Sequence, residues 1–241
     1  MSKVSTASSN RLLALLPAAE RNRVLEDCVE TDLAFGSILH EQGGRIGSVY
    51  FPTHGFISML ATLDGRSTLE VGMIGNEGMC GYTLALDSPV APLRALVQGA
   101  GAALRMRSGT FLEHLRTQPA LRLVVNRYVY VHLRQIAQAA VCLRFHVVEK
   151  RLARWLLMTR DRAHADSFYV TQDFLASMLG VRRVGVSAAA STLQAQGLVR
   201  YARGDVTIID GKGLEAASCA CYRSDLAIHR QGMSARPVAR H

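Results

Sequence analysis

The chain has 241 residues, 49% of them hydrophobic, and a formal net charge of +9. It contains no run of 18 apolar residues, and its N-terminal MSKVSTASSN has no apolar segment, which argues against a membrane span and a secretory signal. Five scattered Cys give no disulfide framework, so we expect a cytoplasmic protein. A basic chain suits a polyanionic partner, and residues 147–241 hold 14 Lys and Arg against 8 Asp and Glu.

The first hundred residues change pattern near residue 32. Residues 10–30 predict short amphipathic helices, with Pro17 well placed to start the second. From about 32 to 107, short apolar runs alternate with Gly-rich breaks, and Asp64-Gly65 is a hairpin signal. This pattern predicts an all-β sandwich or barrel.

A long helix is predicted from about Ala120 to Arg144. Apolar and small residues recur along one face at spacings of three and four. Such a stripe forms either protein core or a dimer seam, and we favour the seam because a DNA-binding protein of this kind needs a two-fold dimer. The expected dimer contacts are Leu121, Val125, Tyr128, His132, Gln135 and Ala139.

A helix-turn-helix is predicted after a further amphipathic helix, VVEKRLARWLLMTRDRA. Thr171 suits a helix N-cap, and Gly180 can adopt the left-handed conformation that ends this helix. A second helix begins near Val184 and ends at Gly197, with its inward face formed by Val186, Ala189, Ala190 and Leu193. Two short strands about Arg203-Gly204-Asp205 follow, which completes a winged helix, an arrangement typical of DNA binding.

The chain resembles the Crp/Fnr family of bacterial transcription regulators over roughly residues 12–215. The resemblance rests on the Gly-rich β segment, the long helix, VEKRLARWLL and TQDFLASMLGVRRVGVSAAASTLQAQGLV. The positions in register with the family pattern are Thr171, Ala176, Gly180, Arg183, Val186, Ser187, Leu193, Gly197 and Leu198.

The resemblance implies an α+β fold with three parts. These are an N-terminal double-stranded β-roll similar to a cyclic-nucleotide-binding domain, a long dimerisation helix and a C-terminal winged helix-turn-helix. We therefore divide the chain into a sensor domain at 1–118, a dimerisation helix at 119–146, a DNA-binding domain at 147–225 and a flexible basic tail at 226–241.

The resemblance also assigns the DNA contacts. Arg183 matches the family's base-reading arginine, and an Arg–guanine pair is the commonest specific contact. The predicted base-reading set is Arg183, Val184, Ser187, Ala188 and Ser191. Val184 and Ala188 depart from the family, since neither can hydrogen-bond a base edge. Phosphate contacts are expected from Thr171, Arg182, Arg200 and Arg203, and these position the protein without reading sequence.

The sensor cassette departs from the family pattern. Glu77 could bind a ribose, and Gly78 follows it, but neither Ala91-Pro92 nor Asp87-Ser88 supplies the arginine that holds a cyclic phosphate. Arg94 is the nearest candidate, two or three positions late. A cyclic nucleotide is therefore disfavoured, and a degenerate pocket or another small-molecule effector, bound by Glu77, Gly78 and Arg94, is expected instead.

Other cofactors have no signature. Cys28 alone lies where an iron–sulfur cluster would need several thiolates, and His40, His54 and Cys80 have no pattern that supports haem. Cys219 and Cys221 form a C-x-C pair that metal or redox chemistry could use, but with only His229 nearby no metal site is assigned.

The predicted function is a homodimeric transcription regulator that binds two-fold sites in double-stranded DNA, contacts RNA polymerase, and is neither an enzyme nor a membrane protein. We find no nucleophile–base set, zinc-protease motif or phosphate loop. The alternative is a small-molecule sensor that acts through protein contacts. Steep salt dependence of binding would separate the two, because only DNA binding releases many counterions.

Overall fold

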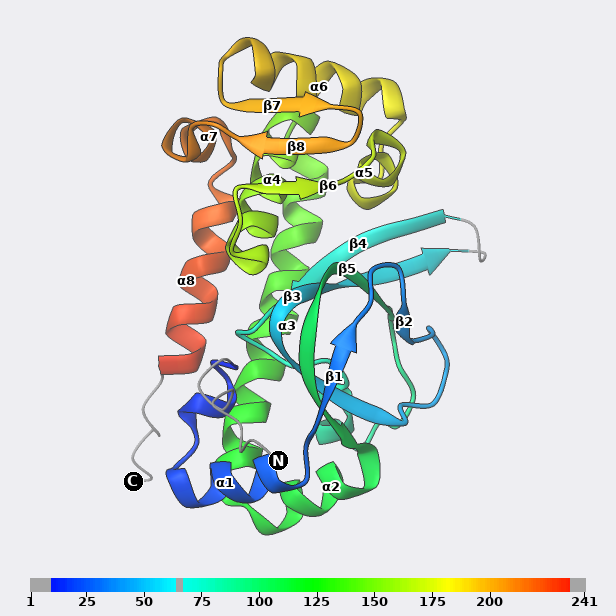
Figure 1. The fold of residues 1–241 in the computed structure, drawn as a ribbon, viewed down its shortest axis with the longest axis vertical. Coiled ribbons are helices and arrows are strands. Elements are labelled where there is room, and N and C mark those ends of the chain that lie inside the picture. The colour runs from blue at the N-terminus through cyan, green and yellow to red at the C-terminus, as the bar shows by residue number, and fades with distance from the viewer. Residues whose placement is uncertain (1–9, 64–66, 235–241) are drawn as a thin grey trace.

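The computed structural model describes residues 10–63 and 67–234 of the protein. Figure 1 shows a β-rich domain at one end and a smaller helical domain at the other, with the long helix α3 running between them. The predicted hairpin turn at Asp64-Gly65 and the last seven residues of the predicted tail lie outside the described residues. Among the described residues, no helix combines the length and apolar composition needed to cross a lipid bilayer.

The N-terminal domain is an antiparallel β-roll, as predicted. Its strands pair in the order β1-β5-β3-β4, with β2 also on β5. Gly55 lies at φ +74°, and any side chain there would strike the carbonyl oxygens of Gly99 and Ala100, so glycine lets β3 and β5 approach closely. The strands are β1 (Val29–Leu33), β2 (Ile38–His40), β3 (Ser48–Leu63), β4 (Ser67–Ile74) and β5 (Arg94–Arg107).

Short helices close the roll around one hydrophobic core. Phe51, Phe111 and Tyr128 are among its largest fully buried side chains and come from a strand and two helices. Apolar side chains on several elements therefore meet inside one roll. These helices are η2 (Leu13–Leu15), α1 (Ala18–Glu26), η3 (Tyr82–Leu86) and α2 (Ser108–Thr117).

The long helix α3 (Pro119–Phe145) buries the face that we expected to form the dimer seam. Leu121, Val125, Tyr128 and His132 are at most 2% exposed within a single chain, because they pack into the β-roll core and around Tyr82. Gln135 and Ala139, later on the same face, are half-buried. The choice of Leu121, Val125, Tyr128 and His132 as dimer contacts was therefore wrong, because this part of the stripe is protein core, the alternative that the spacing had left open.

The C-terminal domain has the predicted winged-helix order. Its second hydrophobic core is formed mainly by side chains of α4, α5, α6 and the strands, with Trp155 and Leu193 buried in it. The elements are α4 (Val148–Ala163), β6 (Ser167–Tyr169), α5 (Gln172–Leu179), α6 (Arg183–Ala195), β7 (Val199–Ala202), β8 (Asp205–Ile208) and α7 (Gly211–Ala217).

A final helix, α8 (Cys221–Ser234), replaces most of the predicted flexible tail. It returns from the winged helix along α3 toward the β-roll (Figure 1). Tyr222, Ile228 and Met233 are buried, and Gly232 packs so closely on Val131 that a methyl group would not fit without displacing it. The tail prediction is wrong for residues 226–234, because apolar contacts with α3 order them.

The two domains meet where β3 packs on α4 and β4 packs on α5. The Glu70 carboxylate accepts a hydrogen bond from the Trp155 indole at 2.9 Å and one from the Ser58 hydroxyl. Burial raises the pKa of Glu70 to about 7, although these hydrogen bonds and the charges of Arg154 and Arg162 oppose the shift. The packed arrangement therefore keeps a large fraction of this carboxyl protonated up to neutral pH.

Glu70 should make stability pH-dependent. Its pKa is about 7 when folded and near 4.5 when unfolded, so the folded chain binds more protons between these values. The free energy of unfolding contributed by this group should then fall as pH rises from about 4.5 to about 7 and level off above. Glu70→Gln should flatten that slope in urea titrations, whereas the exposed Glu41→Gln should not. Equal slopes in wild type and Glu70→Gln would contradict the assignment.

Candidate nucleic-acid interface

Two residues fix the ends of α5, the helix that precedes α6. The Thr171 hydroxyl accepts a hydrogen bond from the Phe174 backbone N–H at 3.2 Å, which confirms its role as N-cap. Gly180 ends α5 at φ +60°, where its N–H bonds the Ser177 carbonyl. Together they set where α6 begins relative to the rest of the domain.

One face of α6 is anchored in the domain. Val186, Ala189, Ala190 and Leu193 are at most 6% exposed, and α6 packs closely on α4. The small Ala189 and Ala190 let the two helices approach, as the spacing predicted. The opposite face is therefore held rigidly toward solvent, at the upper end of the molecule in Figure 1.

The five predicted base-reading residues lie on that solvent side. Arg183 has a side chain 66% exposed and Val184 is 71% exposed, while Ala188 and Ser191 are also exposed. Ser187 is half-buried, and its hydroxyl donates to the Gln172 side-chain oxygen. The helix thus offers one guanidinium, two hydroxyls and two methyl-bearing side chains to a ligand.

Arg183 has one acidic neighbour. Its Nε lies 3.5 Å from an oxygen of Asp173, and both side chains are mostly exposed. Exposed pairs of this kind contribute about 0–1 kcal/mol, so the guanidinium can leave Asp173 for a stronger partner at little cost.

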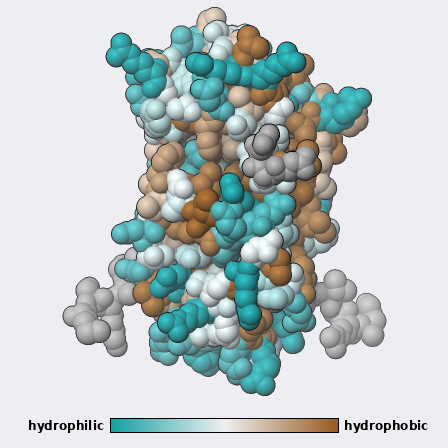
Figure 2. Space-filling model, turned by 90° about the vertical axis from the view of Figure 1, so that its right-hand side faces the viewer, coloured by the Kyte–Doolittle hydropathy of each residue, from teal (hydrophilic) through white to brown (hydrophobic). Residues whose placement is uncertain are grey.

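The predicted phosphate contacts surround this face. β7 and β8 form the wing, whose turn places Arg203 at φ +54° and Gly204 at φ +94°. Arg182, Arg200 and Arg203 are all exposed. Figure 2 shows hydrophilic side chains projecting from this upper end of the molecule. Arg182 precedes α6 as its N-cap, Arg200 lies on β7, and Arg203 lies in the wing turn, so their role as phosphate contacts stays a prediction.

The predicted effector pocket is not assembled. Glu77 forms an ion pair with Arg162 at 2.8 Å, and that neighbouring charge holds the pKa of the carboxyl below its usual value despite burial. Any side chain at Gly78 would overlap the Tyr128 hydroxyl. Arg94 pairs instead with Glu41 at 2.8 Å on the surface. The carboxylate and the arginine therefore have separate partners, and their joint role as a ligand site is not supported.

A cluster that the sequence analysis did not find lies beside α3. Cys142 and His146, at the end of α3, meet the C-x-C pair Cys219 and Cys221. His229, the histidine considered with that pair, contacts the Glu77 carbonyl instead. The available signal was the spacing of four between Cys142, near the end of the predicted helix, and His146 just beyond it.

Comparison with known proteins agrees with this geometry. Residues 150–217 match the family model of the Crp-like helix-turn-helix domain. FixK2 from Bradyrhizobium japonicum has a similar structure, with a TM-score of 0.68, 15% identity, and coverage of 80% of this chain and 98% of that one. The c-di-GMP responsive global regulator CLP of Xanthomonas campestris gives a TM-score of 0.66, 18% identity, and coverage of 80% and 99%. A search of curated proteins gives no match.

The chain joins an N-terminal β-roll to a C-terminal winged helix-turn-helix whose helix α6 has one exposed face. Its C-terminal domain belongs to the Crp-like helix-turn-helix family, and the chain has the fold of the Crp/Fnr transcription regulators. The resemblance predicted from the sequence, with its fold class, is confirmed.

Proposed function

We propose that the protein is a sequence-specific transcription regulator that binds a two-fold DNA site as a homodimer. The observation that carries this is the exposed face of α6, where Arg183 is flanked by Val184, Ala188 and Ser191. Arg183 would pair with a guanine, and the apolar groups would contact thymine methyls. The half-site would then hold one dominant guanine beside A/T-rich sequence.

A different face of α3 supports the homodimer. Seven positions spaced alternately by three and four residues are all exposed: Leu123, Asn126, Tyr130, Leu133, Ala137, Ala140 and Arg144. Leu133 is 64% exposed and Tyr130 54%. A 3-4 spacing is the heptad seam of a coiled coil, and one polar Asn within it favours a single register. We assign this stripe as the dimer seam in place of the buried one.

The test of the proposed function is selection of bound fragments from random DNA, with and without cellular metabolites. A two-fold motif with a guanine in each half-site would support it. Recovery of unrelated sequences would favour the alternative of a sensor acting through protein contacts. A motif that emerges only with metabolites would show an effector. Run-off transcription with RNA polymerase on a selected site would then report activation or repression.

Arg200→Ala should weaken binding to every DNA sequence alike. Arg200 is exposed on β7, beside the α6 face, and as a phosphate contact it would carry no sequence information. A dimer loses two such contacts, one in each half-site, so the slope of log affinity against log salt should become shallower by about two. Titration of specific and random duplexes at several salt concentrations measures this, and a loss confined to the specific duplex would contradict it.

A further inference from the structure

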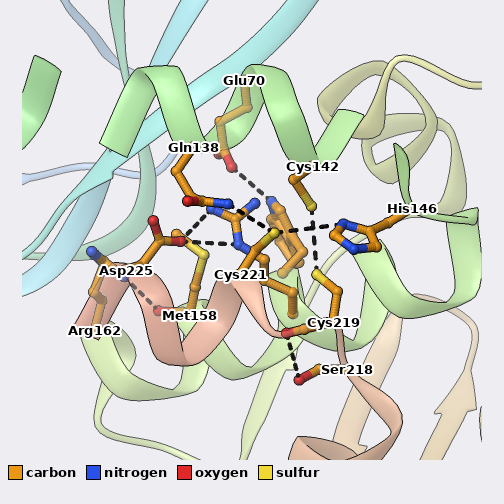
Figure 3. A network of polar contacts seen from close by, with 12 residues as sticks. Glu70, Gln138, Cys142, His146, Met158, Arg162, Ser218, Cys219, Cys221 and Asp225 are labelled. Carbon is orange, nitrogen blue, oxygen red and sulfur yellow. Dashed lines mark hydrogen bonds and ion pairs between the residues drawn. The ribbon is translucent and has the colours of Figure 1, made fainter. Parts of the chain in front are cut away.

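Three cysteines and a histidine come together where the C-terminal segment returns to α3. Cys142 and His146 lie at the end of α3, and Cys219 and Cys221 lie at the junction of α7 and α8. Figure 3 shows the four side chains pointing toward one another from these two segments. The three cysteines are at most 4% exposed and form a buried cluster separate from both hydrophobic cores.

The spacing of the donor atoms fits a tetrahedral metal. The four atoms all lie within 4.8 Å of one another, with Cys142 Sγ 3.5 Å from Cys219 Sγ and Cys221 Sγ 3.5 Å from His146 Nδ1. Zinc–sulfur bonds of about 2.3 Å in a tetrahedron place neighbouring ligands about 3.8 Å apart. Small side-chain movements would therefore be enough to enclose one ion.

The surroundings suit a thiolate-rich site. The Gln138 amide donates to Cys221 Sγ at 3.0 Å, the kind of outer hydrogen bond that orients a thiolate ligand. Three thiolates around a divalent ion leave one net negative charge. Arg151 and Arg154 of α4 lie near Cys142 and Cys219, and because Arg154 is already paired with Asp225, Arg151 is the arginine that can balance this charge.

We propose that Cys142, His146, Cys219 and Cys221 bind one Zn²⁺ ion. Three cysteines and one histidine are a common structural zinc set, and binding would release the thiol protons to solvent. The ion would join the end of α3, next to the α3–α4 break, to the segment that leaves the winged helix. It would thereby fix the winged helix relative to the β-roll.

Metal analysis of the full chain tests the site. Protein purified under reducing conditions from zinc-supplemented cells should contain about one Zn²⁺ per chain. After removal of the metal, Co²⁺ should give the visible bands of a tetrahedral ion and a thiolate charge-transfer band. Zinc well below stoichiometry together with no such Co²⁺ spectrum would overturn the proposal. So would a Cys142–Cys219 disulfide as the stable state of the zinc-supplemented protein.

Single substitutions distinguish zinc binding at this cluster from non-specific metal binding by other cysteines. Cys221→Ser and His146→Asn should each lower zinc affinity by at least tenfold and change the Co²⁺ spectrum. Cys28 and Cys80 lie outside the cluster, so the Cys28→Ser and Cys80→Ser variants should keep the full metal content. If a cluster variant folds poorly, competition with a coloured chelator on wild-type protein still measures the affinity. These readouts involve no DNA, so their outcome is independent of the proposed regulator function.

Discussion

Arg183→Ala should abolish specific DNA binding while leaving non-specific binding and the fold nearly unchanged. Each Arg–guanine pair contributes about 1–3 kcal/mol of discrimination. A dimer loses two, so the affinity for the specific site should fall by roughly 30-fold to 10⁴-fold. Of the other predicted readers of α6, Val184 and Ala188 offer no hydrogen bond to a base edge. The single hydroxyls of Ser187 and Ser191 cannot replace a bidentate Arg–guanine pair.

The matched control is Arg182→Ala. Both arginines are exposed at the start of α6, but Arg182 precedes the helix as its N-cap and is assigned to phosphate. Arg182→Ala should reduce binding to all sequences by a similar small factor. Competitive titration of a selected site against random DNA compares the variants, with melting temperatures reporting folding. Wild-type specificity in Arg183→Ala would refute the assignment.

The DNA-binding domain could be predicted because its signals are local. The N-cap Thr171, the left-handed Gly180 and the apolar spacing of α6 lie within about thirty residues, and each specifies its own part of the backbone. The wing followed from Arg203-Gly204 for the same reason, since a tight turn depends on residues that are adjacent in the chain.

The surroundings of α3 were not predictable from spacing alone. The helix carries apolar residues on more than one side: Tyr128 is buried in its own chain, while Tyr130 and Leu133 are exposed. The spacing of apolar residues shows that a helix has an apolar face, but not which other element packs against that face. The helical contacts of α8 were missed because its buried residues, such as Tyr222 and Ile228, gain their apolar partners only from α3 and α4.

Long-range pairs explain the remaining differences. Glu77 is paired with Arg162, and Cys142 with Cys219, in each case more than seventy residues away. No short motif joins these positions. Glu77 was thus predicted to bind a ligand, although in the fold its carboxylate is paired with Arg162. The thiol cluster was missed because Cys142 and His146 lie far in the sequence from Cys219 and Cys221.

Leu133→Glu should convert the protein to a monomer. Leu133 lies in the middle of the exposed stripe on α3, and in a parallel two-helix seam it would face its own copy. Losing two buried leucines costs about 3 kcal/mol or more, which corresponds to at least 100-fold in the dimer dissociation constant. Two facing carboxylates add repulsion. The affinity for a two-fold DNA site should fall when the dimer is lost, because the second DNA-binding domain is then no longer tethered to the first.

Leu86→Glu is the matched control for this change. Leu86 is 59% exposed at the end of η3 and is not part of the exposed stripe on α3, so the same substitution there tests added charge outside the stripe. Sedimentation of both variants should show a monomer for Leu133→Glu and the wild-type state for Leu86→Glu. A dimeric Leu133→Glu would exclude the α3 stripe as the seam. The two copies of α6 would then need another interface to bring them one helical turn apart on DNA.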